Sequence, residues 1–484
     1  MSLNSSAIRD AHSLCLPPEI NSLGWLRREG FRPSGAPFGD LTLQGLEGLA
    51  GSVEIPFLLR LGRGMLGIAF LLSVAWAFSA HRKKIDWALV TRGLALQLIF
   101  ALLVLKTEWG RGFFRVVNRI FLSAIDFTNQ GAGFLFGALI GGPVPVVGAA
   151  GGEGGTVAMT AMLAFSVLPT IVFFSSLMAL AYYLGIMQRV VKSVAWVMQR
   201  SLGTSGAETT SAAGNIFIGM TEAPLLVRPF VDRMTTSELN TVMTGGFATV
   251  AGGVMAAYVA MLAPFFPDIA GHLLAASIMA APAGIVMSKM LYPETEEPET
   301  RGTLQVELEQ TYVNSIDAAS SGAIDGMKLA LNVAAMLIAF LALIAMVNGM
   351  LAWTTGLFGV EGVTLERLFG WVLAPVAWLI GVPWADAVQV GSLLGIKIVA
   401  NEFVAFQTLA SWLTDGTSLS NQAVLITTYA LTGFASFGAI AIEIGGIGGI
   451  APRRRHDLAR LGIRAMVGGL GATCMTAALA GILA

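Results

Sequence analysis

Acidic side chains lie in two short stretches that are otherwise apolar. The first stretch, AGNIFIGMTEAPLLVRPF, places Glu222 between a helix-ending glycine and Pro224, which favours the first turn of a new helix. The second, GIKIVANEFVAF, holds Lys397, Asn401 and Glu402. An ionisable group at the centre of a membrane costs at least about 2.5 kcal/mol, so a functional role is the first hypothesis for Glu402. Two structural alternatives stay open: a capped surface helix at Glu222, and a cluster of Lys397 and Asn401 that supports a bend.

The composition indicates a membrane protein. Of the 484 residues, 55% are hydrophobic and 12% are charged, whereas a soluble domain has about 25% charged residues; the mean hydropathy is +0.73. The net charge of -1 excludes the basic field that would hold nucleic acid. The 2 cysteines and 4 histidines are scattered, so we expect neither a disulfide framework nor a zinc site. The sequence lacks HExxH and nucleophilic-serine motifs, and we expect no enzyme and no cofactor.

Long apolar runs predict an all-α integral membrane protein with eight transmembrane helices. The expected spans are about 63–80, 86–105, 157–185, 236–265, 270–291, 323–352, 420–447 and 459–483. Amphipathic segments that are typical of interfacial helices occur at 107–127, 190–200 and 365–378. The two acid-bearing stretches lie at about 203–230 and about 386–413, and are too short and polar to cross a bilayer. We expect both to be re-entrant hairpins, named the first hairpin and the second hairpin below.

A short repeat follows each hairpin. MTGGFATVAGG (243–253) follows the first hairpin, and ALTGFASFGAI (430–440) follows the second. Corresponding interrupted segments in two halves predict inverted repeats with a binding site near the membrane midplane. The 57 glycines favour close helix packing and broken helices.

The same features predict how the chain is divided and oriented. The expected parts are a polar tail at 1–55, N-terminal spans with an interfacial helix at 56–130, a first repeat at 131–300 and a second repeat at 301–484. Lysines and arginines near the span ends place the basic loop 82–84 inside the cell. Both termini are then predicted to be periplasmic or extracellular.

These motifs resemble those of the concentrative nucleoside transporters, a sodium/nucleoside symporter family. The similarity covers about 60–484 and lies in N-I-F-I-G-x-T-E-A-P-L-L-V-R-P-F, M-T-G-G-F-A-T-x-A-G, A-P-A-G-I-V-M-S-K-M-L-Y-P-E-T-E and G-x-K-x-x-x-N-E-F-V-A. The resemblance implies a homotrimer in the bacterial inner membrane, embedded in the lipid bilayer. It also implies a symporter that imports nucleosides or nucleoside-like solutes, driven by a cation gradient, with sodium as the expected ion.

The resemblance further implies which residues bind. The residues expected at the solute are Met220, Thr221, Glu222 and Val254 on the base side, and Glu402, Phe434, Ser436 and Ala439 on the ribose side. The implied sodium ligands are the side chains of Asn215 and Thr249 and the carbonyls of Ile218 and Val250. Oxygen ligands of this kind suit a hard monovalent cation at unwound helix ends.

Several of these positions depart from the family pattern. Met220 stands where the family has Gln, Ser436 where it has Asn, and Gly438 and Ala439 where it has Ser. A site that loses polar partners accepts different solutes. A different polar small molecule, or coupling to protons instead of sodium, therefore stays open as an alternative.

Glu443 is a further departure, because the family usually carries Gln or an apolar residue there. It follows Ser436 by seven positions, which returns it to the same helical face. Three interpretations stay open: a side chain that reaches the inner membrane surface, a proton acceptor, or a counter-charge for a cationic solute.

Overall fold

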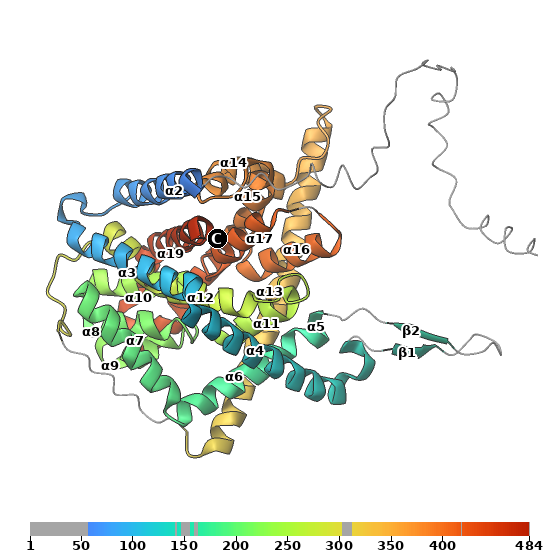
Figure 1. Ribbon diagram of the computed structural model, residues 1–484, viewed down its shortest axis with the longest axis horizontal. Helices are drawn as coiled ribbons and strands as arrows, with labels where there is room; N and C mark the ends of the chain where they lie inside the picture. Colours follow the sequence, from blue (N-terminus) through green and yellow to red (C-terminus); the bar gives the residue numbers. More distant parts are fainter. Residues whose placement is uncertain are drawn as a thin grey trace, which may run out of the picture. The chain divides into compact units, whose positions relative to one another are not determined.

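The computed structural model describes residues 57–140, 143–146, 155–158, 163–302, 312–417 and 419–483. The polar tail predicted at 1–55 lies outside the described residues. Within them the chain is helical, apart from one antiparallel pair of short strands, β1 (Pro143–Val146) and β2 (Gly155–Ala158). Figure 1 shows the order of the elements along the chain.

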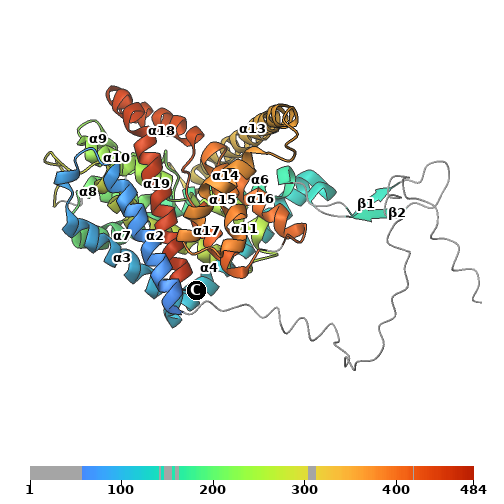
Figure 2. The same cartoon turned by 90° about the horizontal axis from the view of Figure 1, so that it is seen from above.

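Seven helices in the described part of the chain are long and apolar enough to cross a membrane. They are α2 (Phe57–Ala77), α3 (Trp87–Lys106), α6 (Leu168–Tyr183) with the short α5 (Leu163–Ser166) before it, the broken pair α10 (Thr236–Ala248) and α11 (Gly252–Leu262), α12 (Ile269–Leu291), α13 (Ser315–Gly356), and α19 (Arg455–Leu483) with the 3-10 turn η4 (Pro452–Arg454) before it. In Figure 2 the blue α2 runs beside the red α19, against which it packs.

Two predicted spans differ from the structure. The span expected at 157–185 begins later, because β2 takes up its first residues and Pro169 starts α6. The span expected at 420–447 is wrong as a single helix. It consists of α17 (Asn421–Leu431) and α18 (Phe437–Ile450), each too short to cross a membrane alone.

The predicted amphipathic segments are helices. They lie in α4 (Glu108–Phe136), α7 (Ile186–Leu202) and α14 (Leu365–Leu379). Along α7 the buried residues recur every three or four positions, at Met187, Val191, Ala195, Met198 and Leu202, so one face packs inward. The short turn η1 (Arg82–Lys84) lies between α2 and α3, and the turn η2 (Gly137–Ile140) follows α4.

Both hairpins consist of two short helical arms around a break. The first hairpin comprises α8 (Gly206–Gly214), a break, η3 (Ala223–Val227) and α9 (Arg228–Val231), and α8 packs on η3. The second comprises α15 (Trp384–Val399) and α16 (Glu402–Thr414), which pack on each other. Asn401 begins α16, because its side chain accepts a hydrogen bond from the Val404 amide at 2.9 Å.

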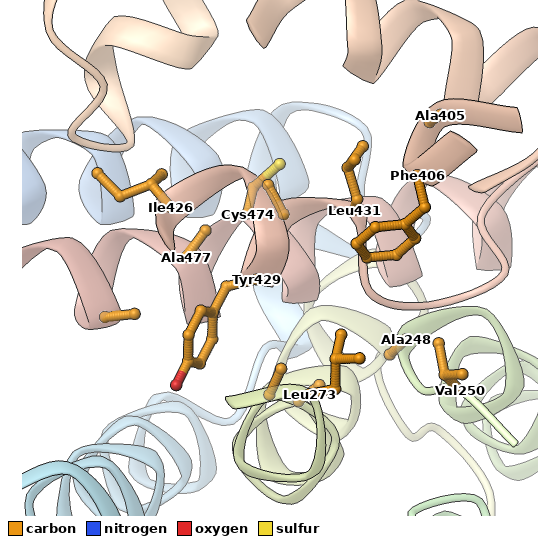
Figure 3. Packing of buried hydrophobic residues seen from close by; sticks show 14 of the residues in the cluster. Ala248, Val250, Leu273, Ala405, Phe406, Ile426, Tyr429, Leu431, Cys474 and Ala477 are labelled. Atoms are coloured by element: carbon orange, nitrogen blue, oxygen red, sulfur yellow. The ribbon is translucent and has the colours of Figure 1, made fainter. Parts of the chain in front are cut away.

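The two short repeats, 243–253 and 430–440, contain the break between α10 and α11 and the break between α17 and α18. These two breaks touch. Gly433 has a φ of +96°, and a Cβ there would lie 2.6 Å from the Phe247 carbonyl oxygen. Only glycine fits both this backbone conformation and this contact. Figure 3 shows that Ala248 and Val250 at the first break share one core with Tyr429 and Leu431 before the second.

Candidate functional site

A cavity of about 890 Å³ lies where the two hairpin breaks face α6, α11, α13 and α18. A volume of this size is in the range of small-molecule sites. All of the residues that we expected at the solute line this cavity: Met220, Thr221, Glu222, Val254, Glu402, Phe434, Ser436 and Ala439. Side chains about 180 positions apart in sequence therefore face one space.

Glu402 is the buried acid on the second-hairpin side of the cavity. Only 5% of it is exposed, and its Oε1 accepts a hydrogen bond from the Tyr258 hydroxyl at 2.9 Å. Tyr258 is held in turn by a stacked contact with Phe406, with ring centroids 4.4 Å apart. The contact with Tyr258 positions the carboxylate to accept hydrogen bonds from solute hydroxyls. Hydrogen bonds to a charged acceptor are stronger than those between neutral groups.

Tyr258 was missed by the sequence reasoning. It lies one helical turn after Val254, on the same face of α11, and this spacing was the available signal. Its partner is 144 positions away in sequence. A local pattern does not reveal such a contact.

Glu222 lies on the first-hairpin side of the cavity. Its Oε2 accepts a hydrogen bond from the Gly219 amide at 2.7 Å, which folds the hairpin break back on itself. Ser436 begins α18 by accepting from the Ala439 amide at 3.3 Å, so its hydroxyl hydrogen stays available to a solute.

Further polar residues at the cavity were also missed, among them Tyr312 and Asp325. Burial raises the pKa of the Tyr312 phenol, and the nearby acids Asp325 and Glu222 add to the rise. Tyr312 thus presents a neutral hydroxyl at the cavity wall.

Lys397 supports the break between α17 and α18 and does not line the cavity. Its fully buried ammonium donates to the carbonyls of Ala430 and Thr432, at 2.8 and 2.9 Å, where α17 ends. A cation at a helix C-terminus offsets the helix dipole and satisfies free carbonyls. No described hydrogen bond joins Lys397 to Asn401: Lys397 holds the end of α17, whereas Asn401 begins α16. The structure therefore does not show the cluster of these two residues that the sequence left open.

The four residues expected at sodium lie where two breaks meet. Asn215 and Ile218 belong to the break of the first hairpin, and Thr249 and Val250 belong to the break between α10 and α11. The Phe217 carbonyl accepts from the Gly252 amide at 3.0 Å, which ties the first hairpin to the break between α10 and α11. Asn215 is fully buried, and neither atom of its side-chain amide has a hydrogen-bond partner among the described residues. That amide lies against Gly245, whose carbonyl accepts from the Thr249 hydroxyl at 2.9 Å.

The donor set at this junction fits a hard cation. A buried amide without partners costs about 1–3 kcal/mol unless something binds it. The carbonyls of Ile218 and Val250 also accept no hydrogen bond from the described residues. Side-chain and carbonyl oxygens of this kind suit a hard cation such as sodium. No group of three or more His, Cys, Asp or Glu that would hold a metal occurs in the described ranges.

Glu443 does not reach the membrane surface. It is fully buried, so the expectation of a side chain extending to the interface is wrong. It lies one turn beyond Ala439 and does not line the cavity.

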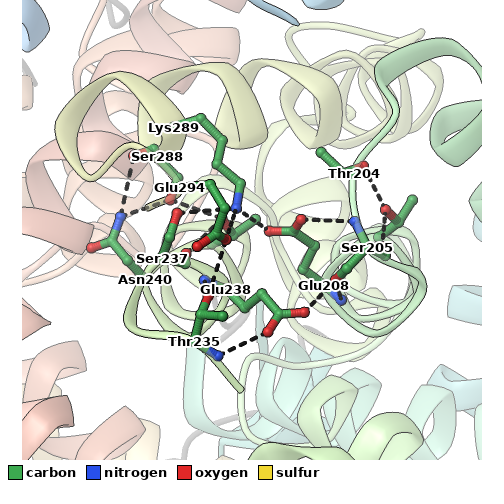
Figure 4. A network of polar contacts seen from close by, with 12 residues as sticks. Thr204, Ser205, Glu208, Thr235, Ser237, Glu238, Asn240, Ser288, Lys289 and Glu294 are labelled. Carbon is green, nitrogen blue, oxygen red and sulfur yellow. Dashed lines mark hydrogen bonds and ion pairs between the residues drawn. The ribbon is translucent and has the colours of Figure 1, made fainter. Parts of the chain in front are cut away.

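A buried polar network holds the first hairpin to α10 and α12 (Figure 4). Lys289 on α12 pairs with Glu208 at 2.8 Å and with Glu294 at 3.1 Å. Ser205, which begins α8, donates to Glu238 at 2.5 Å. The first arm of the hairpin is thus fixed to two spans, and its break is left to face the cavity.

Three family models match this chain. They are described as Na+ dependent nucleoside transporter N-terminus, nucleoside recognition, and Na+ dependent nucleoside transporter C-terminus, and they match residues 66–139, 164–265 and 272–481. An uncharacterized transporter of Bacillus subtilis, YutK, is 42% identical over 87% of this chain and 98% of its own length. The mouse sodium/nucleoside cotransporter 1 is 41% identical over 86% of this chain, which corresponds to 63% of that protein.

Solved structures are similar as well. The structure of CNTnw in an inward-facing substrate-bound state has a TM-score of 0.78 at 42% identity, and the match covers 88% of this chain and 98% of that one. An outward-facing variant of CNTnw gives a TM-score of 0.79 at the same identity.

Proposed function

This chain belongs to the Na+ dependent nucleoside transporter family, and we propose that it is a sodium-coupled symporter that imports nucleosides or nucleoside-like solutes. The observation that carries the proposal is that Glu222, Glu402 and the break between α17 and α18 all line one cavity. Two acids, one from each hairpin, that face a space of this size suit a solute with several hydroxyl and amine donors.

The geometry suggests how each wall of the cavity contacts the solute. Glu402, oriented by Tyr258, accepts hydrogen bonds from ribose hydroxyls. Thr221 and Glu222 face the base, while Val254 and Phe434 provide apolar contact. Burying the solute among these groups orients it and excludes water.

Sodium acts as the co-transported ion in this proposal. Asn215 and Thr249 supply side-chain oxygens, and Ile218 and Val250 supply carbonyls. Because these groups lie in the same two breaks that form the cavity wall, a cation there would fix the conformation of Met220 to Glu222. Sodium and solute would then strengthen each other's binding, which is a coupling free energy between sites.

The proposal includes a particular setting in the cell. The protein is a homotrimer of eight-span protomers in the bacterial inner membrane, with re-entrant hairpins, inverted repeats and both termini outside. The parts predicted at 56–130, 131–300 and 301–484 form its N-terminal spans and two repeats. The touching breaks at Gly433 and Ala248 support the repeat, because corresponding breaks in two halves meet there.

The deciding experiment is uptake into proteoliposomes that contain the purified protein. We expect a radiolabelled nucleoside to accumulate under an inward sodium gradient, and unlabelled solute on the far side to stimulate exchange. Uptake that is equal in sodium and in choline would overturn sodium coupling. The absence of exchange would indicate a channel instead of a carrier.

A second candidate solute class follows from the departures at Met220, Ser436 and Ala439. All three line the cavity with fewer polar atoms than the family pattern has. A screen for thermal stabilisation by nucleosides, bases and amino sugars, with and without sodium, separates the candidates, because a bound solute stabilises the folded state by mass action.

A further inference from the structure

Glu443 is a buried acid without a partner. It is 0% exposed, and neither of its carboxylate oxygens has a hydrogen-bond partner in the described residues. An unpaired ionised carboxylate in such a place costs several kcal/mol. A protonated carboxyl group avoids this cost as the chain is folded here.

The tip of the first hairpin, which carries Met220 and Thr221, covers this carboxyl group. A Cβ on Gly246 would collide with both the Glu443 carboxylate and Met220, so these two side chains share one contact surface on α10. One turn further along α18, a Cβ on Gly446 would collide with Thr221. Two glycines thus let the hairpin tip pack closely over the acid.

Other charged groups do not neutralise Glu443. The ionisable side chains on the elements that pack against α18 are Glu222, Glu238, Asp317, Asp325, Lys328, Asp386, Lys397, Arg453, Arg454, Arg455, His456, Asp457, Arg460, Arg464 and Cys474. Lys397 is bonded to helix carbonyls, and Arg454 is paired with Asp457 at 2.7 Å. No ion pair or hydrogen bond joins any of them to Glu443 in the described residues.

We propose that Glu443 binds and releases one proton during the transport cycle, and that the hairpin tip links this proton to solute binding. The inference rests on the proposed function. While Met220 and Thr221 pack on α18 and α10, the carboxyl is sealed and protonated. When the tip moves away, water reaches the carboxyl, its O–H bond breaks, and the proton passes to water and leaves a solvated carboxylate.

The direction of the linkage follows from where the solute binds. Met220 lines the cavity and also lies beside Glu443 against Gly246. A solute that holds the tip in place therefore favours the protonated acid. Binding takes up a proton, so solute affinity falls as the pH rises, and by reciprocity the proton binds more tightly when solute is present.

The experiment measures the dissociation constant at several pH values for the full chain in detergent with saturating sodium. The probe is whichever of uridine, cytidine, adenosine and inosine binds most tightly. Above the pH at which the proton dissociates, one linked proton raises the Kd of the wild type by about tenfold per pH unit. We expect the Glu443→Gln variant, which keeps the shape but stays uncharged, to lose this slope. The matched control is Asp415→Asn, an exposed acid at the end of α16, which should keep it.

Calorimetry gives an independent readout. Binding heats measured in buffers of different ionisation enthalpy yield the number of protons taken up, which should be about one in the wild type and about zero in Glu443→Gln. Glu443→Met serves the same purpose if the Gln variant does not fold. Equal slopes and equal proton counts in the wild type and these variants would overturn the inference while leaving nucleoside transport intact. If none of the four nucleosides binds in sodium at any pH, the proposed function fails and the inference falls with it.

Discussion

At the scale of single residues, Glu402 combines burial, a fixed hydrogen bond and access to the cavity. Its charge is costly to bury, and Tyr258 alone does not offset that cost, because one hydrogen bond to a charged group is worth about 1.5–3 kcal/mol. A solute that donates further hydrogen bonds would complete the site. The acid is thus placed for binding rather than for folding.

Replacing Glu402 by Gln should therefore reduce uptake by about tenfold or more while the protein still folds, because the charge-assisted acceptor is lost and the shape is kept. Sodium-driven uptake and the thermal midpoint are measured together. The matched control is Glu366→Gln, an acid outside the cavity that accepts from Asn348 at 3.0 Å and should leave uptake unchanged. Full uptake by a well-folded Glu402→Gln variant would contradict the assignment.

The departures from the family pattern predict weak binding of uridine. Changing Met220→Gln, Ser436→Asn and Ala439→Ser together would restore up to three hydrogen bonds, worth about 0.5–1.5 kcal/mol each. We expect the uridine Kd to fall by about tenfold or more, since about 1.4 kcal/mol is a factor of ten. The measurement is uridine binding in saturating sodium. Micromolar binding by the wild type that the triple change fails to improve would show that other residues recognise the base.

The sequence located the cavity residues better than their partners. All of the residues expected at the solute face one cavity, because the motifs that carry them are local. The contacts of Tyr258 and the cover over Glu443 depend on chain segments that meet only after folding. Burial at Glu443 also excluded the surface alternative, which spacing alone left open.

At the scale of elements, the two breaks at Asn215 and Thr249 are expected to bind sodium together. Replacing either residue by Ala removes one oxygen ligand, so the sodium concentration for half-maximal uptake should rise by about tenfold, with little change in maximal uptake. Thr354→Ala is the matched control, because the hydroxyl of this exposed threonine donates to the Met350 and Leu351 carbonyls of its own helix. Unchanged sodium dependence in both Asn215→Ala and Thr249→Ala would assign the ion to another place.

The contact between the two breaks gives a prediction for Gly433. A Gly433→Ala change adds both a positive-φ strain of about 1–3 kcal/mol and a collision with the Phe247 carbonyl. Gly416→Ala isolates the first effect, since Gly416 has a φ of +75° and open space around it. The thermal midpoint in detergent should fall for both variants and clearly further for Gly433→Ala. Equal losses would mean that the breaks do not press on each other.

Hydropathy did not predict the break between α17 and α18. The residues of α17 and α18 are together apolar enough to suggest one span, and the local signals of the break are few: Gly433, and Ser436 where α18 begins. The break exists because another broken helix crosses there and Lys397 satisfies the freed carbonyls. Length and composition predict spans, whereas a crossing depends on the partner helix.

At the scale of the whole molecule, the polar network around Lys289 connects parts of the chain that transport requires to act together. It joins the first arm of the first hairpin, the start of α10 and the end of α12. The side chains of Lys289 and Glu208 are only 7% and 1% exposed. Because the first arm of the first hairpin is fixed, the break of this hairpin is the part that can change conformation when solute and ion bind.

Lys289→Met should therefore destabilise the protein by about 3–5 kcal/mol, because it leaves the buried Glu208 and the partly exposed Glu294 without their counter-charge. Adding Glu208→Gln to Lys289→Met removes one of the uncompensated charges and should recover part of the loss. The matched control is Lys328→Met, whose pair with Asp325 is solvent-exposed and worth less than about 1 kcal/mol. Denaturant titration in mixed micelles measures the free energy of unfolding of all three variants. A Lys289→Met variant as stable as Lys328→Met would mean that the network does not hold the hairpin to the spans.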